Sequence, residues 1–240
     1  MKFNAWAKTD VGLKRSSNED SILIDEKLGL FIVADGMGGH EGGEVASSIA
    51  VKTAKDIIQN QNYQKNITTE NLIRRAFDEA SQRIFHKSHV ESPELMGMGT
   101  TMILALLKGD RLYFGNVGDS RAYLFRKPKL WQISEDHSLV NEQIKAGVIK
   151  EEDSENVVGK NVITRSVGFE KNVQPDVFVR TVQPNENILL CSDGLSGMVP
   201  DRQMAQLLAD TPPAKVVPKA IQAAKKGGGD DNISVIFIQF

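Results

Sequence analysis

The stretch LFIVADGMGG, Leu30–Gly39, holds the pattern that decides the fold. Five consecutive apolar residues are followed without a gap by Asp35 and Gly36. A short apolar run bounded by a turn signal is typical of a β-strand. An acid beside a glycine at the end of one strand usually marks a turn. A simple turn is a weaker interpretation here, because an acid adjoins an apolar run at several other places in the chain.

Three other apolar runs also adjoin an acid. LYFGNVGDSR ends at Asp119, ILLCSDGLSG delivers Asp193, and GGGDDNISVIFIQF carries Asp231 before a final apolar run. A fifth acidic element, RSSNED, ends at Asp20 before the expected strand at 21–24. Flanking glycines let the backbone approach closely at these points. We therefore expect several carboxylates to meet at one edge of the fold.

Carboxylates gathered at one edge repel one another and resist ionising together unless a cation neutralises them. Oxygen ligands without His or Cys suit hard ions such as Mg²⁺ or Mn²⁺ rather than zinc. Two such ions that share one carboxylate can lower the pKa of a shared water and hold a phosphoryl oxygen for in-line attack. The acids therefore predict metal-dependent phosphoryl chemistry.

The remaining chain predicts the elements around these acids. Seven apolar, β-branched runs indicate strands: Ser21–Ile24, Leu28–Ala34, Thr100–Lys108, Arg111–Val117, Ala122–Arg126, Glu186–Ser192 and Ile233–Phe240. Five segments have helical spacing: Gly43–Gln59, Glu70–His86, Leu139–Ala146, Asp201–Ala209 and Ala214–Lys225. Short turns between strands favour antiparallel sheets over alternating βαβ units.

Two packed sheets with helices on the outside would bury every apolar face. The expected fold class is α+β, a four-layer α-β-β-α sandwich built as a single domain over residues 1–240. The segment 135–167 is polar and poor in apolar residues. It predicts a surface excursion, and long excursions of this kind often serve as lids.

The overall composition argues against some classes of function but does not identify one. The chain of 240 residues has 29 Lys and Arg against 31 Asp and Glu, a formal charge of −2 that argues against binding nucleic acid or an anionic membrane. Its one cysteine, Cys191, cannot form an internal disulfide, and a reducing cytosol is the expected compartment. No signal peptide or run of about 18 apolar residues predicts export or a membrane span.

Taken together and in order, the motifs resemble the metal-dependent protein phosphatases of type 2C, most closely their compact bacterial branch. The residues that carry the resemblance span nearly the whole chain: Arg15-x-x-Asn18-Glu19-Asp20, Asp35-Gly36-Met37-Gly38-Gly39-His40, Gly99-Thr100-Thr101, Gly115-Asn116-x-Gly118-Asp119-Ser120-Arg121, Ser192-Asp193-Gly194 and Gly228-Gly229-x-Asp231-Asn232. The resemblance implies a serine/threonine phosphoprotein phosphatase that uses a metal-bridging hydroxide and forms no phosphoenzyme.

The resemblance also implies a binuclear Mn²⁺ or Mg²⁺ centre at one end of the sandwich. Asp35 would bridge the two ions, and Asp119 matches the acid of a third, weaker ion. Glu19 and Asp20 would act mainly through bound waters. The full set of metal ligands it implies, direct or through water, is Asp35, Gly36, Asp119, Asp193, Asp231, Glu19 and Asp20.

Outside the metal ligands, the resemblance implies that Arg15 grips phosphate and that Asn232 orients ligands or substrate beside Asp231. Many eukaryotic members carry His where Met37 stands, and His40 is the candidate acid for the leaving alkoxide. Two alternatives stay open: His40 only shapes the groove, and a metal-bound water protonates the alkoxide. The segment 135–167 corresponds to the family's flap, in which Val157-Val158 replaces a frequent His-Pro pair.

A second hypothesis of a different class is an inactive phosphatase-like module that binds phosphoproteins or a kinase. Pseudoenzymes usually lose ligands, whereas Asp35, Asp193, Asp231 and Arg15 are all present, which favours the enzyme. The expected partners are proteins phosphorylated on Ser or Thr, such as those of a cognate bacterial kinase. A cytoplasmic monomer is the default expectation.

Overall fold

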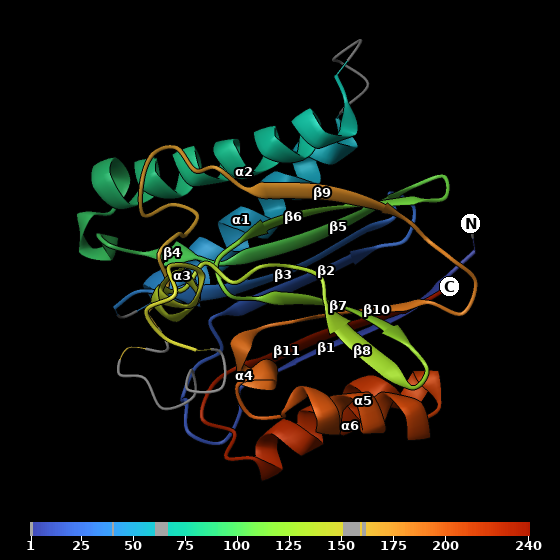
Figure 1. Cartoon of the computed structure of the whole chain (residues 1–240). Helices are drawn as coiled ribbons and strands as arrows, with labels where there is room; N and C mark the ends of the chain where they lie inside the picture. The colour runs from blue at the N-terminus through green and yellow to red at the C-terminus, as the bar shows by residue number, and fades with distance from the viewer. Residues whose placement is uncertain (1, 40, 61–66, 151–158, 160–161) are drawn as a thin grey trace.

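Two β-sheets lie face to face between two layers of helices (Figure 1). The computed structural model describes residues 2–39, 41–60, 67–150, 159 and 162–240. All strand pairs within the two sheets are antiparallel. The expected α+β sandwich of four layers is therefore confirmed.

The first sheet has five strands and is called here the β1–β8 sheet. In spatial order its strands are β1 (Asn4–Asp10), β11 (Ile233–Gln239), β10 (Asn187–Cys191), β7 (Arg121–Arg126) and β8 (Lys129–Gln132). Its central strands come from the C-terminal half of the chain, whereas the edge strand β1 comes from the N-terminus. The two termini lie near each other in the finished sheet (Figure 1).

The second sheet is called here the β2–β9 sheet. Its strands follow the order β2 (Asp20–Asp25), β3 (Leu30–Met37), β5 (Met102–Lys108), β6 (Arg111–Val117) and β9 (Asp176–Thr181), and the short β4 (Gly99–Thr100) pairs with the end of β3. The strand predicted from the opening stretch, β3, lies inside this sheet. Its last residues therefore reach the sheet edge between neighbours on both sides.

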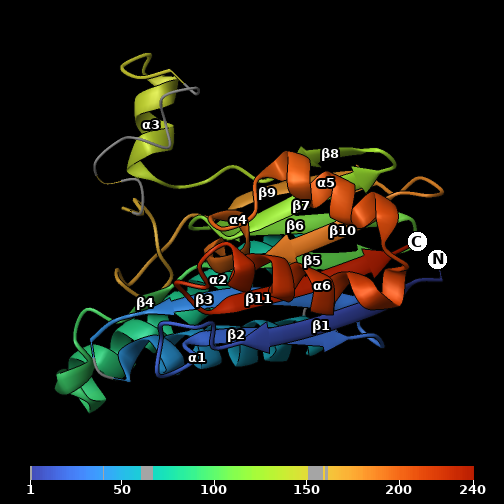
Figure 2. The same ribbon diagram turned by 90° about the horizontal axis from the view of Figure 1, so that it is seen from below.

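Helices cover both outer faces of the sandwich (Figure 2). The β2–β9 sheet carries α1 (Gly42–Gln59) and α2 (Thr69–His86), and the β1–β8 sheet carries α5 (Asp201–Asp210) and α6 (Pro213–Lys226). The π-helical turn η2 (Lys87–Glu91) and the 3-10 turn η3 (Pro93–Leu95) follow α2. The single turn α4 (Asp193–Ser196) follows β10, and α3 (Leu139–Lys145) stands apart at one end.

Alternation along β3 shows how four layers are held together. Leu30, Ile32 and Ala34 face the core beneath α1 and α2. Phe31 and Val33 face the core between the sheets. A third core lies between the β1–β8 sheet and α5 and α6. Both faces of a central strand are thus buried, which explains why its sequence is apolar without a break.

The predicted helices are found within a few residues of their expected bounds, but strands β1, β8 and β9 were not predicted. Each of these three lies at the edge of a sheet and keeps residues exposed to solvent. In the part of the chain that the structure describes, no helix is long and apolar enough to cross a membrane.

Candidate metal centre

The predicted acids meet at one end of the sandwich, where strands of both sheets end. Asp20 and Asp35 are direct cross-strand partners in β2 and β3. Asp193 begins α4 immediately after β10. The charges of Asp20, Asp193 and Asp119 act on Asp35, and the charge of Asp231 acts on Asp193. Segments far apart in the sequence thus bring five carboxyl groups together.

The main chain of Asp35 is held on all sides by hydroxyl and amide groups. Its N–H donates to Thr101 Oγ1 at 3.0 Å, and its carbonyl accepts from Thr101 N and from Thr100 Oγ1, both at 2.8 Å. Thr101 Oγ1 in turn lies 2.8 Å from Ser120 Oγ. The Asp35 carboxyl group therefore projects from a main chain that is fixed on both sides, and its side chain shares a hydrogen bond with that of Asp193.

Two glycines let α1 approach the end of β3. A Cβ on Gly36 would collide with the Gly43 carbonyl, and a Cβ on Gly43 would collide with the Glu19 carboxylate. Gly36 N also donates to the Glu19 carbonyl at 3.2 Å. The start of α1, the end of β3 and Glu19 are consequently packed at a separation that only glycine allows.

Burial and mutual repulsion disturb the ionisation of these acids. Removal from water, aided by the charges of Asp20, Asp193 and Asp119, raises the pKa of Asp35 well above its ordinary value. Removal from water is also the largest cause that raises the pKa of Asp20 and of Asp119 to about 7 each. The pKa of Asp193 rises for the same reason, with a contribution from Asp231. The cluster resists carrying its full negative charge unless positive charge is brought to it.

The donor set fits a hard cation. Among the described residues, Asp20 Oδ1 and Asp193 Oδ1 are buried carboxylate oxygens without a hydrogen-bond partner. Such orphaned oxygens are costly unless a ligand satisfies them. Within the described ranges, no three His, Cys, Asp or Glu side chains are placed so that they alone could hold a metal ion. Main-chain carbonyls and water would complete the coordination, as is usual for Mg²⁺.

Arg15 is the cation at this acidic end. Its Nη2 donates to Asp231 Oδ2 at 2.7 Å, and its side chain is 52% exposed. The charge of Asp231 is the main cause that raises the pKa of Arg15, and Glu19 and Asp35 contribute. The guanidinium group thus lies at the mouth of the acid cluster, where a phosphate group could reach it.

Comparison with known proteins identifies this arrangement. The family model described as protein phosphatase 2C matches residues 14–217. The chain belongs to the protein phosphatase 2C family. The "Serine/threonine phosphatase stp" of Listeria monocytogenes is 37% identical over 246 aligned residues, which cover 99% of this chain and 96% of that protein. The expected family and enzyme class are both confirmed.

Solved structures agree over the whole length. The serine/threonine phosphatase PstP/Ppp of Mycobacterium tuberculosis superposes with a TM-score of 0.91 at 32% identity, covering 99% of this chain and 98% of that one. A PstP catalytic domain in complex with two manganese ions superposes with a TM-score of 0.87 at 32% identity, covering 99% and 97%. The sandwich described above is therefore the protein phosphatase 2C fold.

Asn232 lies beside the acids of this family member and holds its N-terminal loop. Its Oδ1 accepts from Glu19 N at 2.7 Å, and its Nδ2 donates to the carbonyls of Val11 at 3.0 Å and Ser17 at 2.9 Å. Its own N–H donates to Asp231 Oδ1 at 2.8 Å. Both amide hydrogens are thus engaged by the loop that carries Arg15, which favours a positioning role over direct contact with substrate.

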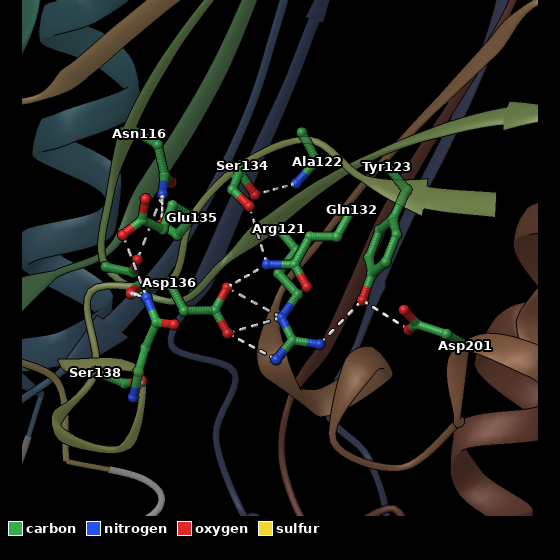
Figure 3. A network of polar contacts seen from close by, with 12 residues as sticks. Asn116, Arg121, Ala122, Tyr123, Gln132, Ser134, Glu135, Asp136, Ser138 and Asp201 are labelled. Carbon is green, nitrogen blue, oxygen red and sulfur yellow. Dashed lines mark hydrogen bonds and ion pairs between the residues drawn. The ribbon is translucent and has the colours of Figure 1, made fainter. Parts of the chain in front are cut away.

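The sequence analysis missed an ion pair at the start of the segment 135–167 (Figure 3). Arg121 donates from Nε and Nη2 to the carboxylate of Asp136 at 2.6 to 3.1 Å. Arg121 Nη1 also donates to the Tyr123 hydroxyl at 3.0 Å, and that hydroxyl donates to Asp201 Oδ1 at 3.0 Å. Arg121 follows Asp119 by two residues, so this pair joins a predicted metal ligand to the flap.

His137 forms a second attachment near the start of the segment 135–167. Its imidazole is buried, accepts from Gly118 N at 3.1 Å through Nδ1, and lies 3.1 Å from Asp176 Oδ2 through Nε2. Arg165 donates to Asp176 Oδ1 at 3.1 Å. Neither attachment has a local sequence pattern, because the partners lie 11 to 39 residues apart.

Two predicted features, His40 and the pair Val157-Val158, lie outside the described residues. Met37, which stands where many eukaryotic members carry His, is the last residue of β3 and is half-buried.

Proposed function

We propose that this protein hydrolyses phosphoserine and phosphothreonine in proteins and uses two Mn²⁺ or Mg²⁺ ions to do so. The observation that carries the proposal is the cluster of Asp20, Asp35, Asp119 and Asp193, whose mutual charge and burial raise their pKa values. The family membership supports the reaction class. The named relatives and the structure with two manganese ions support the substrate and the metal.

In this proposal Asp35 and the Gly36 carbonyl would help to hold one ion, and Asp35, Asp193 and Asp231 would hold the other. Asp119 would serve a third ion, and Glu19 and Asp20 would act through coordinated water. When bound, the ions would supply a water that ionises near neutral pH and positive charge opposite the phosphoryl oxygens. The chain itself supplies the fixed base of Asp35 and the close glycine contacts that set the separation of the acids.

Arg15 binds the phosphoryl group of the substrate and orients the scissile bond in line with the attacking oxygen. A planar guanidinium can grip two phosphate oxygens at once, which suits this task. Asn232 positions Arg15 through the loop that it binds. The leaving alkoxide needs a proton, for which His40 and a coordinated water are the two candidates.

We further propose a single domain over residues 1–240, a flap at 135–167, a cytoplasmic location and a monomeric state. The substrates would be the phosphoproteins of a cognate bacterial kinase, and nucleic acid and membranes would not be partners. The lone, buried Cys191 and the formal charge of −2 support these assignments.

Turnover of p-nitrophenyl phosphate, with and without Mn²⁺, separates the enzyme from an inactive binding module. We expect metal-dependent release of nitrophenol between pH 6 and 9, and a phosphothreonine peptide should be hydrolysed under the same conditions. A protein that binds phosphopeptide but releases no nitrophenol at any of these pH values would be the inactive module.

A further inference from the structure

A groove of about 660 Å³ lies between α1 and the corner where α2 passes into η2. Ile49 of α1 and Phe85 of α2 are half-buried in its wall, and Val90 of η2 is 65% exposed. Wide helical turns of the η2 type often mark functional sites. No residue that lines this groove belongs to the acid cluster or to the flap attachments described above.

The lining of the groove is positively charged, although the whole chain has a formal charge of −2. Lys52, Arg83, Lys87 and Lys171 line it against a single acid, Glu91. Lys87 pairs with Glu91 at 3.1 Å, and Arg83 pairs with a carboxylate one helical turn earlier. Lys52 and Lys171 form no ion pair with any residue that the structure describes. Their charge is therefore available to a partner.

The segment 167–171 connects the groove to the end of the sandwich where the acids lie. Ser81 of α2 donates to the Glu170 carbonyl at 2.7 Å, next to Lys171. Val167 exchanges two main-chain hydrogen bonds with Thr100, at 2.8 and 3.0 Å. Thr100 also holds the carbonyl of the central acid of β3. One short segment thus joins the rim of the groove to the acid cluster.

The separation between groove and acids suits one continuous peptide. Helix α1 starts at the acid cluster, where Gly43 packs against Gly36. At about 1.5 Å per residue, Ile49 and Lys52 lie ~9 and ~14 Å farther along the helix axis than Gly43. An extended peptide covers that length in about three to five residues. A substrate segment close in sequence to its phosphorylated residue can therefore reach the groove.

We propose that this groove binds an acidic, partly apolar segment of the phosphoprotein substrate, about three to five residues from the phosphorylated side chain. The proposal rests on the phosphatase function proposed above. Lys52 and Lys171 attract the acidic side chains, and the surface formed by Ile49, Phe85 and Val90 takes one apolar side chain. The groove would select among substrates without touching the reacting phosphate.

The test uses two phosphothreonine peptides with extensions that differ only in charge. One extension carries two Glu and one Leu four residues from the phosphothreonine, and in the other Gln replaces each Glu. Each pair is made with the extension before and after the phosphothreonine. Because exposed charges in an interface chiefly set selectivity, we expect the wild-type KM for the better-placed acidic peptide to be about tenfold lower than for its Gln counterpart.

The double variant Lys52→Glu/Lys171→Glu should remove that difference and leave kcat/KM for p-nitrophenyl phosphate within twofold of wild type. The matched control is Lys215→Glu/Lys219→Glu, which makes the same charge change on exposed positions of α6 in the opposite helical layer. A third variant, Val90→Ser, should raise the KM for the acidic peptide that carries Leu. It should leave the KM unchanged for a peptide that carries Ser at the same position. Fluorescence anisotropy with the unphosphorylated acidic peptide measures binding independently of turnover.

Several results would overturn the docking site. One is a wild-type KM that is equal for the acidic peptide and its Gln counterpart, and another is an equal loss of this selectivity in the α6 control. A parallel loss of kcat/KM for p-nitrophenyl phosphate in the groove variant, or a concentration-dependent wild-type dimer that the groove variants no longer form, would also overturn it. If wild type turned over neither p-nitrophenyl phosphate nor peptide with Mn²⁺, the phosphatase proposal would fail. The anisotropy comparison of wild type and groove variant would still show whether the groove binds the acidic peptide.

Discussion

The acids and the residues proposed to contact substrate are held in different ways. Asp20 and Asp35 are part of paired strands, and Asp193 follows one directly. Arg15 lies on a loop that Asn232 holds, and Arg121 binds Asp136 at the start of the segment 135–167. The difference teaches that this fold holds the acids proposed as metal ligands mainly through paired strands, whereas it holds the residues proposed to contact substrate through side-chain hydrogen bonds to loops.

The sharpest test of this contrast is the loss of one strand-borne acid. Asp193→Asn should lower kcat for p-nitrophenyl phosphate by about 10³-fold or more, because preorganised electrostatic stabilisation of the transition state is lost. The same variant should be at least as stable as wild type in the presence of a chelator, since it removes one of several repelling charges. Kinetics and thermal unfolding measure the two effects.

The neighbouring acid Asp230 supplies the control, because it is exposed and its substitution by Asn should leave both quantities unchanged. Near-normal kcat in Asp193→Asn would refute the ligand assignment.

The root of the flap should show the next largest effect, and mainly in stability. Asp136→Asn leaves the mostly buried Arg121 guanidinium without its carboxylate, a change that costs about 2–4 kcal/mol for pairs of this kind. Since about 1 kcal/mol corresponds to 2–4 °C in a domain of this size, Tm should fall by roughly 4–16 °C. Differential scanning calorimetry of the metal-free protein provides the measurement.

The control removes both partners of the ion pair. Arg121→Met/Asp136→Leu should be more stable than Asp136→Asn, because no buried charge is left alone. An additive loss in the double variant would show that the ion pair does not fasten the flap.

On the substrate side, Arg15→Ala should raise KM for phosphate esters by about tenfold and change kcat less. The loss of one charge-assisted contact to phosphate accounts for this size. Arg15→Lys should recover part of the affinity, since lysine keeps the charge and loses the fork-shaped donor pair. Steady-state kinetics with p-nitrophenyl phosphate measures the changes in KM and kcat separately. An unchanged KM would show that Arg15 does not bind the phosphate.

The smallest expected effect is the pH dependence of stability in the metal-free protein. Asp20 and Asp119 keep their protons up to a pKa of about 7 in the fold, whereas an unfolded chain releases them near pH 4. The folded state therefore binds more protons between these values, so stability is lost as the pH rises through that window. We expect Tm measured in chelator to fall between pH 5 and 8.

Added Mn²⁺ should flatten this dependence, because a bound cation favours the ionised carboxylates. A metal-free Tm that rises over the same pH range would mean that the acids do not repel one another as described.

How far the sequence predicted the fold depended on burial. Central strands such as β3 and β11 were predicted because both of their faces are covered, which makes their sequences apolar throughout. Strands β1, β8 and β9 lie at sheet edges, where one side faces solvent and the apolar signal is diluted. These segments form strands because they pair with neighbouring strands, and their own sequences do not indicate which strands those are.

The site divides in the same way. Asp35, Asp193 and Asp231 stand next to apolar runs, so the chain itself marks them as strand ends. The bond from Arg121 to Asp136 spans 15 residues, and that from Asn232 to Ser17 spans 215. Such contacts exist only after the two sheets have packed. Sequence reasoning therefore reached the carboxylates and, through the family motif, Asn232, but it did not find the partners that Asp136 and His137 bind.

The pairing of β1 with β11 has a consequence for how the protein is made. Asn4 lies opposite Gln239, so one of the first strands synthesised must wait for one of the last. Asn232, which braces the loop of Arg15, arrives equally late. Contacts of such long sequence separation slow folding. Strands β2, β3, β5 and β6 can pair early, whereas β1 stays unpaired until β11 is available, so the acids gather at one end only when the β1–β8 sheet is complete.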